Sequence, residues 1–323
     1  QAAGYIRRLA EILLGQGVAA EQLTQIISTL NDALTRRIIE LEKTRHALAG
    51  IEWCWLAFGS EGRHEQTISS DQDNGLIFRD YQHRTEGQAR ELLLPFAQAV
   101  NRALDACGFP LCKGNIMAGN PRWCLSLPEW QAQFSAWVRD PEPEALMNAA
   151  IFFDIRPLYG NDELAETLRE TMRALTWNNE RFLRQMAQEA LQARPPLGLL
   201  RDFVTGEDGE LDLKKSGVRL FVDAARVFGL AAGVSPSSTA QRLREAGAKL
   251  NVQETELAAM VEAFFFIQSL RLREQMTPDA GRLQESHNRI HPDKLNDVDR
   301  RILKECLRQA RRLQTRLALD YQL

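Results

Sequence analysis

The first fifty residues carry apolar side chains at alternating three- and four-residue spacing. The stripe comprises Leu23, Ile27, Leu30, Leu34, Ile38 and Leu41, with Leu48 one heptad beyond. Such spacing places the residues on one face of a helix, so we predict helix through residues 1–50. We interpret the stripe as a face that packs on the following domain. Because it is long and narrow, a self-associating helix pair, and with it a homodimer, is the alternative.

Residues 51–160 mix strand and helix signals, because short apolar runs alternate with a longer amphipathic pattern. The predicted elements are strands at 53–58, 75–78 and 111–117, helices at 87–107 and 128–138, and a segment at 149–156 that fits either a strand or a helix end. A small mixed sheet with helices covering one face accounts for this order.

Beyond residue 160 the pattern is helical almost throughout. The predicted helices are 163–177, 179–193, 217–230, 238–250, 254–276 and 297–319. The predicted fold class is therefore α+β: a small mixed β-sheet domain at 51–160, flanked by an N-terminal helical segment at 1–50 and a C-terminal all-helical domain at 161–323.

Composition and net charge argue against several classes of protein. The net charge of −3 over 323 residues argues against a nucleic-acid-binding protein, which normally has a basic excess. No run reaches the roughly 18 apolar residues of a membrane helix. The five cysteines include no Cys-x-x-Cys pair, so a reducing cytoplasm is the predicted location. The chain begins at Gln1 without an initiator Met, and we interpret it as a fragment of a longer protein.

The polar loop between the first two predicted strands contains the candidate chemistry. Asp71 and Asp73 are two residues apart, so in a strand they project to the same face and repel unless a cation lies between them. Gly59 and Ser60 permit close backbone approach to a phosphate, and Arg63 offers a guanidinium that matches phosphate geometry. Mg²⁺ bridging carboxylates and triphosphate is the chemistry of nucleotidyl transfer. A structural turn, with Arg63 paired to a neighbouring glutamate, is the alternative.

The loop and its flanking strands resemble the nucleotidyltransferase superfamily with the polymerase-beta-like fold. Residues 59–78 are similar to the signature of the branch that includes the N-terminal domain of the uridylyltransferase of the nitrogen-signalling protein PII. The resemblance continues at 117–123, 153–160, 212–217 and 270–275. It implies Mg²⁺-dependent transfer of a nucleoside monophosphate from a nucleoside triphosphate, with two metal ions possible. It also implies a signal-transduction protein with cyclic-nucleotide-binding or CBS regulatory domains N-terminal to this fragment.

Several further residues are candidates for the site. Enzymes of this superfamily generally use a third carboxylate on a neighbouring strand, but no acid occurs between Asp105 and Glu129. Asp154 lies in an apolar segment and is the best remaining acid, although an ion pair with Arg156 or with a nearby basic residue explains it as well. Ser70 joins the nucleotide-binding candidates, although its position also fits a residue that shapes the loop.

The helical half supplies two cationic candidates for nucleotide binding. Lys214 belongs to a local basic patch, and Arg271 lies on a helix face with Gln275 one turn away. Cations on a domain that closes over a triphosphate suit this role, whereas charged runs on helices are usually solvated faces. We expect Asp71 and Asp73 to face a cleft between the sheet and the carboxy-terminal helices, with Ser60 close by.

The sequence leaves two functions from different classes. The first is an enzyme that transfers a nucleoside monophosphate, uridylyl or adenylyl, to a protein or small-molecule acceptor. The second is a non-catalytic sensor that binds a triphosphate and signals through its helices. The pair Asp71 and Asp73 favours the enzyme, and the missing acid near 111–117 favours the sensor. RNA-directed nucleotide addition is disfavoured by the acidic charge balance.

Overall fold

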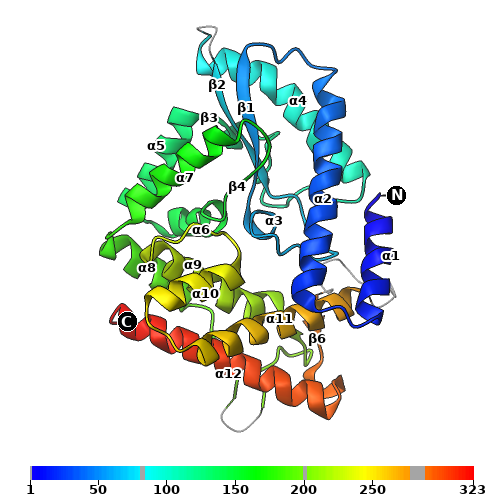
Figure 1. Ribbon diagram of the computed structural model, residues 1–323, viewed down its shortest axis with the longest axis vertical. Helices are drawn as coiled ribbons and strands as arrows, with labels where there is room; N and C mark the ends of the chain where they lie inside the picture. The colour runs from blue at the N-terminus through cyan, green and yellow to red at the C-terminus, as the bar shows by residue number, and fades with distance from the viewer. Residues whose placement is uncertain (1, 81–83, 199–201, 277–287) are drawn as a thin grey trace. The chain divides into compact units, whose positions relative to one another are not determined.

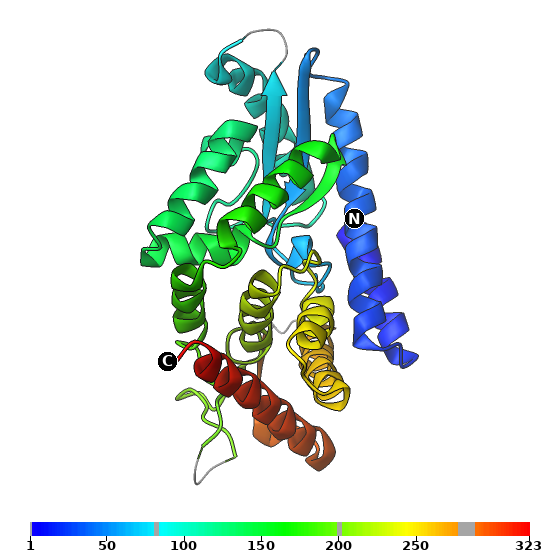
Figure 2. The same ribbon diagram turned by 60° about the vertical axis from the view of Figure 1, so that its left-hand side comes forward.

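The computed structural model describes residues 2–80, 84–198, 202–276 and 288–323. The chain divides into two compact units. The sheet unit comprises Gln1–Leu13 and Gln22–Leu175, and the helical unit comprises Leu14–Glu21 and Thr176–Leu323. Figures 1 and 2 show the elements of each unit. A compact unit need not fold independently. The division into three domains that we predicted from the sequence therefore stays a prediction.

The sheet unit is built on four strands in the order β3-β2-β1-β4. The strands are β1 (Ile51–Ala57), β2 (Asn74–Asp80), β3 (Cys124–Ser126) and β4 (Arg156–Gly160). Strand β1 pairs antiparallel with both β2 and β4, whereas β2 and β3 are parallel. The predicted mixed sheet is therefore confirmed. The predicted strand at 111–117 is wrong, because Asn115 adopts φ +54° and its N–H closes a turn onto the Cys112 carbonyl at 2.9 Å.

Helices cover both faces of the sheet rather than the single face we expected. The helices of this unit are α1 (Ala2–Gly15), α2 (Ala20–Lys43), α3 (Gly59–Gly62), α4 (Glu86–Ala106), α5 (Leu127–Arg139), α6 (Pro143–Phe152) and α7 (Asp162–Thr176), with a 3₁₀ turn η1 (Pro121–Trp123). The helical unit includes Leu14–Glu21, so it contains the last residues of α1 and the first residues of α2. The segment 149–156 resolves as the end of α6 followed by the start of β4.

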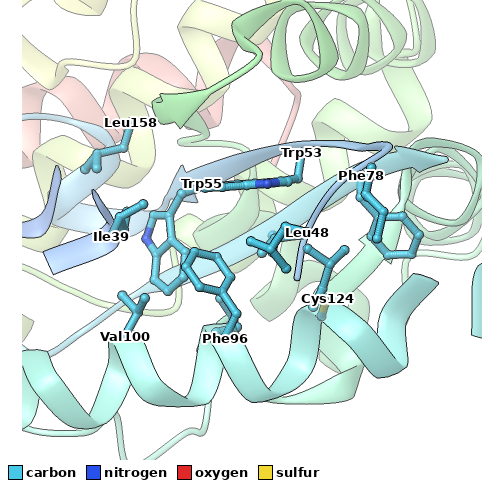
Figure 3. Packing of buried hydrophobic residues seen from close by; sticks show 14 of the residues in the cluster. Ile39, Leu48, Trp53, Trp55, Phe78, Phe96, Val100, Cys124 and Leu158 are labelled. Atoms are coloured by element: carbon cyan, nitrogen blue, oxygen red, sulfur yellow. The ribbon is translucent and has the colours of Figure 1, made fainter. Parts of the chain in front are cut away.

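One face of the sheet packs on α2 and α4 through a continuous apolar core. Trp55 is fully buried between the sheet and these helices, beside Ile39 of α2 and Val100 of α4 (Figure 3). Trp53 contacts Phe96 of α4, with ring centroids 5.1 Å apart. Alternation along β1 produces this face, because residues 53, 55 and 57 point toward the same helices.

The opposite face packs on α5 and α6 through aromatic side chains. Phe58 follows β1 and contacts Phe152 of α6 at a centroid separation of 4.7 Å and Trp130 of α5 at 5.9 Å. The Trp130 indole N–H donates to the Leu76 carbonyl of β2 at 3.1 Å. Burying a tryptophan is favourable here because its polar atom keeps a hydrogen-bond partner. The end of β1 is thus fixed from both faces.

The helical unit confirms the helices predicted beyond residue 176. It contains α8 (Glu180–Ala190), α9 (Arg219–Ala231), α10 (Thr239–Lys249), α11 (Glu254–Met276) and α12 (Asp297–Asp320), with a π-helix η2 (Lys214–Val218) and a 3₁₀ turn η4 (Pro292–Lys294). It also contains a two-stranded ladder of β5 (Leu211–Asp212) and β6 (Arg289–Ile290). Within the described ranges, no helix has the length and apolarity that a membrane crossing requires.

Candidate active site

The candidate site forms at the end of the sheet where β1 finishes. Ala57, the last residue of β1, pairs with Asn74 at the start of β2 and with Arg156 at the start of β4. The residues just beyond these three positions therefore gather at one edge. They are Gly59 and Ser60 after β1, Asp73 before β2 and Asp154 before β4. Strand order alone brings together segments almost a hundred residues apart.

Gly59 lies directly against the Asp73 carboxylate. Its backbone has φ +53°, a left-handed conformation that favours glycine, and a Cβ at this position would lie 3.1 Å from Asp73 Oδ2. The Phe58 N–H donates to the Asp73 carbonyl at 2.9 Å, which fixes the two segments side by side. The short helix α3 starts here, so a bare glycine backbone faces the acid, as the phosphate-and-metal hypothesis requires.

Residues 71–74 alternate in burial, although regular strand β2 begins only at Asn74. Gln72 and Asn74 are 3% and 1% exposed, whereas Asp71 is exposed and Asp73 is half-buried. An extended chain directs neighbouring side chains to opposite sides, so the inward amides leave Asp71 and Asp73 on the other side together. The roles of the two acids as metal ligands stay a prediction.

Arg63 is buried in an internal ion-pair network. Its Nε donates to Glu65 Oε2 at 2.7 Å, and its Nη1 donates to Asp154 Oδ2 at 2.5 Å. The alternative that paired Arg63 with a neighbouring glutamate is therefore what the geometry shows. Asp154 is fully buried and pairs with Arg63, which fits the alternative of an ion pair with a nearby basic residue. Its carboxylate lies near the site edge, and its catalytic role stays a prediction.

Helix α2 contributes a buried polar face that sequence reasoning missed. The two oxygens of Asp32 each accept from Arg156 at 2.9 Å, and Arg156 Nη2 also donates to the Glu61 carbonyl at 3.1 Å. Asn31 donates to Gln66 Oε1 at 3.2 Å. We interpreted α2 from its apolar stripe alone, but Ser28, Asn31, Asp32 and Thr35 recur at helical spacing and are all buried. The helical spacing of these polar residues is the sequence signal from which this second buried face could have been predicted.

Glu61, a buried acid at this edge, has a pKa far from its ordinary value. Burial raises its pKa to about 8; Arg156 opposes this shift, and the negative charges of Asp32 and Asp73 reinforce it. The Glu61 carboxyl also accepts a hydrogen bond from the Asp73 backbone N–H. Next to it, burial and Arg156 lower the pKa of His64, which has φ +56°. The loop thus holds, beside Asp73, a buried carboxyl whose raised pKa favours its protonated form.

Cys112 is a second neighbour of Asp73 that sequence reasoning did not select. Its Sγ donates to Asp73 Oδ1 at 3.4 Å. Burial and the adjacent Asp73 raise the pKa of this thiol, which keeps it protonated at neutral pH. The loop that was expected to be a strand therefore supplies a hydrogen-bond donor to the candidate site.

The remaining sequence candidates serve the loop itself or belong to the helical unit. Ser70 Oγ accepts from the Thr67 N–H at 3.1 Å and donates to the Thr67 carbonyl at 3.0 Å, as a loop-shaping residue would. In the helical unit Lys214 is exposed. Arg271 is 5% exposed and donates to Gln268 Oε1 at 2.6 Å and to Asn288 Oδ1 at 2.8 Å. Nucleotide binding by these three residues stays a prediction.

The donor set suits a hard divalent cation. Carboxylate oxygens are the ligands that Mg²⁺ prefers, and Mg²⁺ is commonly held by one or two carboxylates together with water and substrate phosphates. A Cβ at Gly59 would lie 3.1 Å from Asp73 Oδ2, so the glycine places backbone rather than a side chain beside that oxygen. Among the described residues, no group of three or more His, Cys, Asp or Glu side chains forms a metal-binding cluster.

A strand, a glycine turn and a following Asp-x-Asp on a mixed sheet define the class of nucleotidyl-transfer domains suggested by the sequence. The chain matches the family model described as putative nucleotidyltransferase DUF294 over residues 4–144. It matches the model described as putative nucleotidyltransferase substrate binding domain over residues 180–321. The chain belongs to this nucleotidyltransferase family, which indicates nucleotidyl transfer in general. No curated protein matches it.

Proposed function

We propose that the protein is a Mg²⁺-dependent nucleotidyltransferase that moves a nucleoside monophosphate from a nucleoside triphosphate to a protein or small-molecule acceptor. The observation that carries this proposal is the placement of Gly59 against Asp73, with Asp71 exposed beside it. This placement brings a glycine backbone, which a phosphate can approach closely, next to acids that can hold a cation. The match to a substrate-binding model supports a nucleotide substrate for the helical unit.

Each residue has a defined task in this reaction. Asp71 and Asp73 would hold Mg²⁺, which when bound would neutralise charge on the triphosphate. The backbone of Gly59 and Ser60 binds the β- and γ-phosphates. An acceptor oxygen attacks the α-phosphorus, the bond to the pyrophosphate oxygen breaks, and pyrophosphate departs. Arg63 keeps the loop folded through Glu65 and Asp154.

The resemblance to PII uridylyltransferase makes UTP the first substrate to test, with ATP second. A cytoplasmic signalling role, regulatory domains beyond Gln1 and a homodimer belong to the same proposal. A non-catalytic triphosphate sensor is the second candidate, because Asp154, our candidate for the third carboxylate, is fully buried and ion-paired with Arg63. The two candidates differ in one measurable product, pyrophosphate.

The test is incubation of the protein with each of the four α-labelled ribonucleoside triphosphates, with and without Mg²⁺ and with a cell extract as acceptor source. Mg²⁺-dependent pyrophosphate release with label transfer supports the enzyme. Mg²⁺-dependent binding without pyrophosphate release, across all four triphosphates, supports the sensor. If no triphosphate binds in the presence of Mg²⁺, both candidates are wrong.

A further inference from the structure

Three buried amide side chains surround the start of β2, on the side opposite the candidate acids. They are Gln72, Asn74 and Asn101, which are 3%, 1% and 4% exposed. The first two alternate with Asp71 and Asp73 along the chain, and Asn101 comes from the middle of α4. We call this group the amide clamp. Buried amides are costly unless their donors and acceptors are paired, so their contacts decide what they do.

Asn101 uses both ends of its side chain within the clamp. Its Nδ2 donates to Gln72 Oε1 at 2.8 Å and to Asn74 Oδ1 at 3.0 Å. Its Oδ1 accepts from the Gly119 N–H at 2.8 Å. Because the amide nitrogen meets two oxygens and the amide oxygen meets an N–H, the orientation of the group is determined.

The other two amides connect the clamp to the surrounding backbone. Gln72 Nε2 donates to the Asn101 carbonyl at 3.0 Å and to the Phe109 carbonyl at 2.8 Å. Asn74 Oδ1 also accepts from the Ala118 N–H at 2.9 Å. The clamp therefore joins residues 71–74, helix α4 and the loop that follows it. A network whose members are paired in this way rigidifies its surroundings.

The clamp determines the direction in which the side chains of Asp71 and Asp73 point. Gln72 is drawn inward to α4, so its neighbours Asp71 and Asp73 are directed outward and to the same side. Backbone bonds reinforce this, because the Gln72 N–H donates to the Pro110 carbonyl at 3.2 Å and the Asn74 N–H to the Ile116 carbonyl at 3.2 Å. Since residues 71–73 precede the regular ladder of β2, these bonds take the place of strand pairing in fixing the segment.

We propose that Asn101 is a positioning residue for nucleotidyl transfer, which sets the separation and direction of Asp71 and Asp73 through the amide clamp. The inference rests on the proposed function for its catalytic meaning. Asn101 itself touches no substrate. It acts by making the two carboxylates a preorganised pair, so that Mg²⁺–triphosphate binds without first ordering the segment.

The test compares Asn101→Asp with Val100→Ala. The first change keeps shape but replaces the donor that faces two oxygens with a third oxygen. Val100 is the adjacent buried residue of α4, packs in the apolar core and has no part in the clamp. Val100→Ala therefore serves as the control for lost stability. Asn101→Ser, which removes the donor and leaves room for water, replaces Asn101→Asp if that variant does not fold.

Two measurements are made on each folded variant. The first is the Mg²⁺ concentration that gives half-maximal binding of a fluorescent ribose-labelled UTP. Asn101→Asp should raise this concentration about tenfold, because breaking the buried hydrogen bonds leaves the segment to be ordered by Mg²⁺–UTP, and excess Mg²⁺ should restore most binding. Val100→Ala should leave it unchanged. The second is amide hydrogen exchange, which should accelerate at residues 72–74 and 118 in Asn101→Asp and not in Val100→Ala.

The two measurements separate failure of this inference from failure of the proposed function. Equal exchange at 72–74 in the two variants overturns the positioning role whether or not nucleotide binds. Equal Mg²⁺ half-saturation in the two variants overturns its link to the metal site. Accelerated exchange in Asn101→Asp, combined with no Mg²⁺-dependent binding of any of the four ribonucleoside triphosphates by the parent protein, supports the clamp and contradicts the proposed function.

Discussion

The loop segment at 71–74 in the sheet unit and the cationic segments of the helical unit were both predicted to contribute to the nucleotide site, yet they bury different kinds of group. In the loop, neutral amides point inward while Asp71 stays exposed and Asp73 half-buried. In the helical unit the buried group is a cation, Arg271, whose guanidinium binds amide oxygens.

The difference teaches that a charged side chain indicates a site only when its neighbours direct it outward. Arg63 and Arg271 were both assigned to phosphate on residue type, and both prove to be buried and engaged with side-chain oxygens. Arginine presents donors in a fork that suits carboxylates and amides as well as phosphate. The partner is therefore decided by the fold, and variants in the two regions should behave differently.

The largest expected effect concerns the network beneath the loop. Arg63→Met removes the cation that Glu65 and Asp154 share, and breaking a buried pair typically costs about 3–5 kcal/mol. The free energy of unfolding in urea should fall by that amount. Arg37→Met, which breaks the exposed pair with Glu40, should change it by less than about 1 kcal/mol. Equal losses in the two variants would show that the network does not stabilise the loop.

The next effect concerns the outward acids. Asp73→Asn and Asp71→Asn keep size and remove charge, so pyrophosphate release should fall by on the order of 10² or more. Thermal unfolding should be unchanged or slightly improved, because repulsion between the acids is relieved. Asp105→Asn, at an exposed acid of α4, should leave the rate unchanged. Full Mg²⁺–triphosphate affinity in both site variants would exclude this loop as the nucleotide site.

A third prediction uses the raised pKa of Glu61. Its folded pKa of about 8 exceeds its value of 4.5 in the absence of the fold, so the protonated form favours folding. That contribution is complete below about pH 4.5 and is lost as pH rises to 8. Glu61→Gln, which stays neutral, should therefore gain stability relative to the parent between pH 5 and pH 9, by on the order of 2–4 kcal/mol. Urea titrations without metal measure the free energy of unfolding of both proteins. A difference between them that stays constant from pH 5 to pH 9 would contradict this prediction.

The smallest effect is expected in the helical unit. Lys214→Ala removes an exposed charge, so Mg²⁺–UTP affinity should weaken by less than about fivefold even if Lys214 contacts phosphate. Lys294→Ala, at another exposed lysine of this unit, is the control and should have no effect. Equilibrium binding at low and high salt measures both. A loss above tenfold for Lys214→Ala would move the main phosphate contact into the helical unit.

Sequence alone determined the secondary structure and the motif that carries the chemistry. Helix α11 (Glu254–Met276) was predicted to the residue from its helix-forming composition, and the other helices beyond residue 160 were predicted to within a few residues at each end. The strands around the loop followed from short apolar runs, and the signature at 59–78 identified the family. These features depend on neighbours in the chain, so they can be recognised without knowing the fold.

Tertiary structure alone decided which distant groups meet. The pairing of Arg63 with Asp154, the contact between Asp32 and Arg156, and the amide clamp around Asn101 each join segments between 27 and 124 residues apart. Strand 111–117 failed as a prediction because turn-forming residues outweighed a short apolar run. Hydrogen bonds and ion pairs depend on distances of about 3 Å, and those distances are fixed only when the strands and helices have packed.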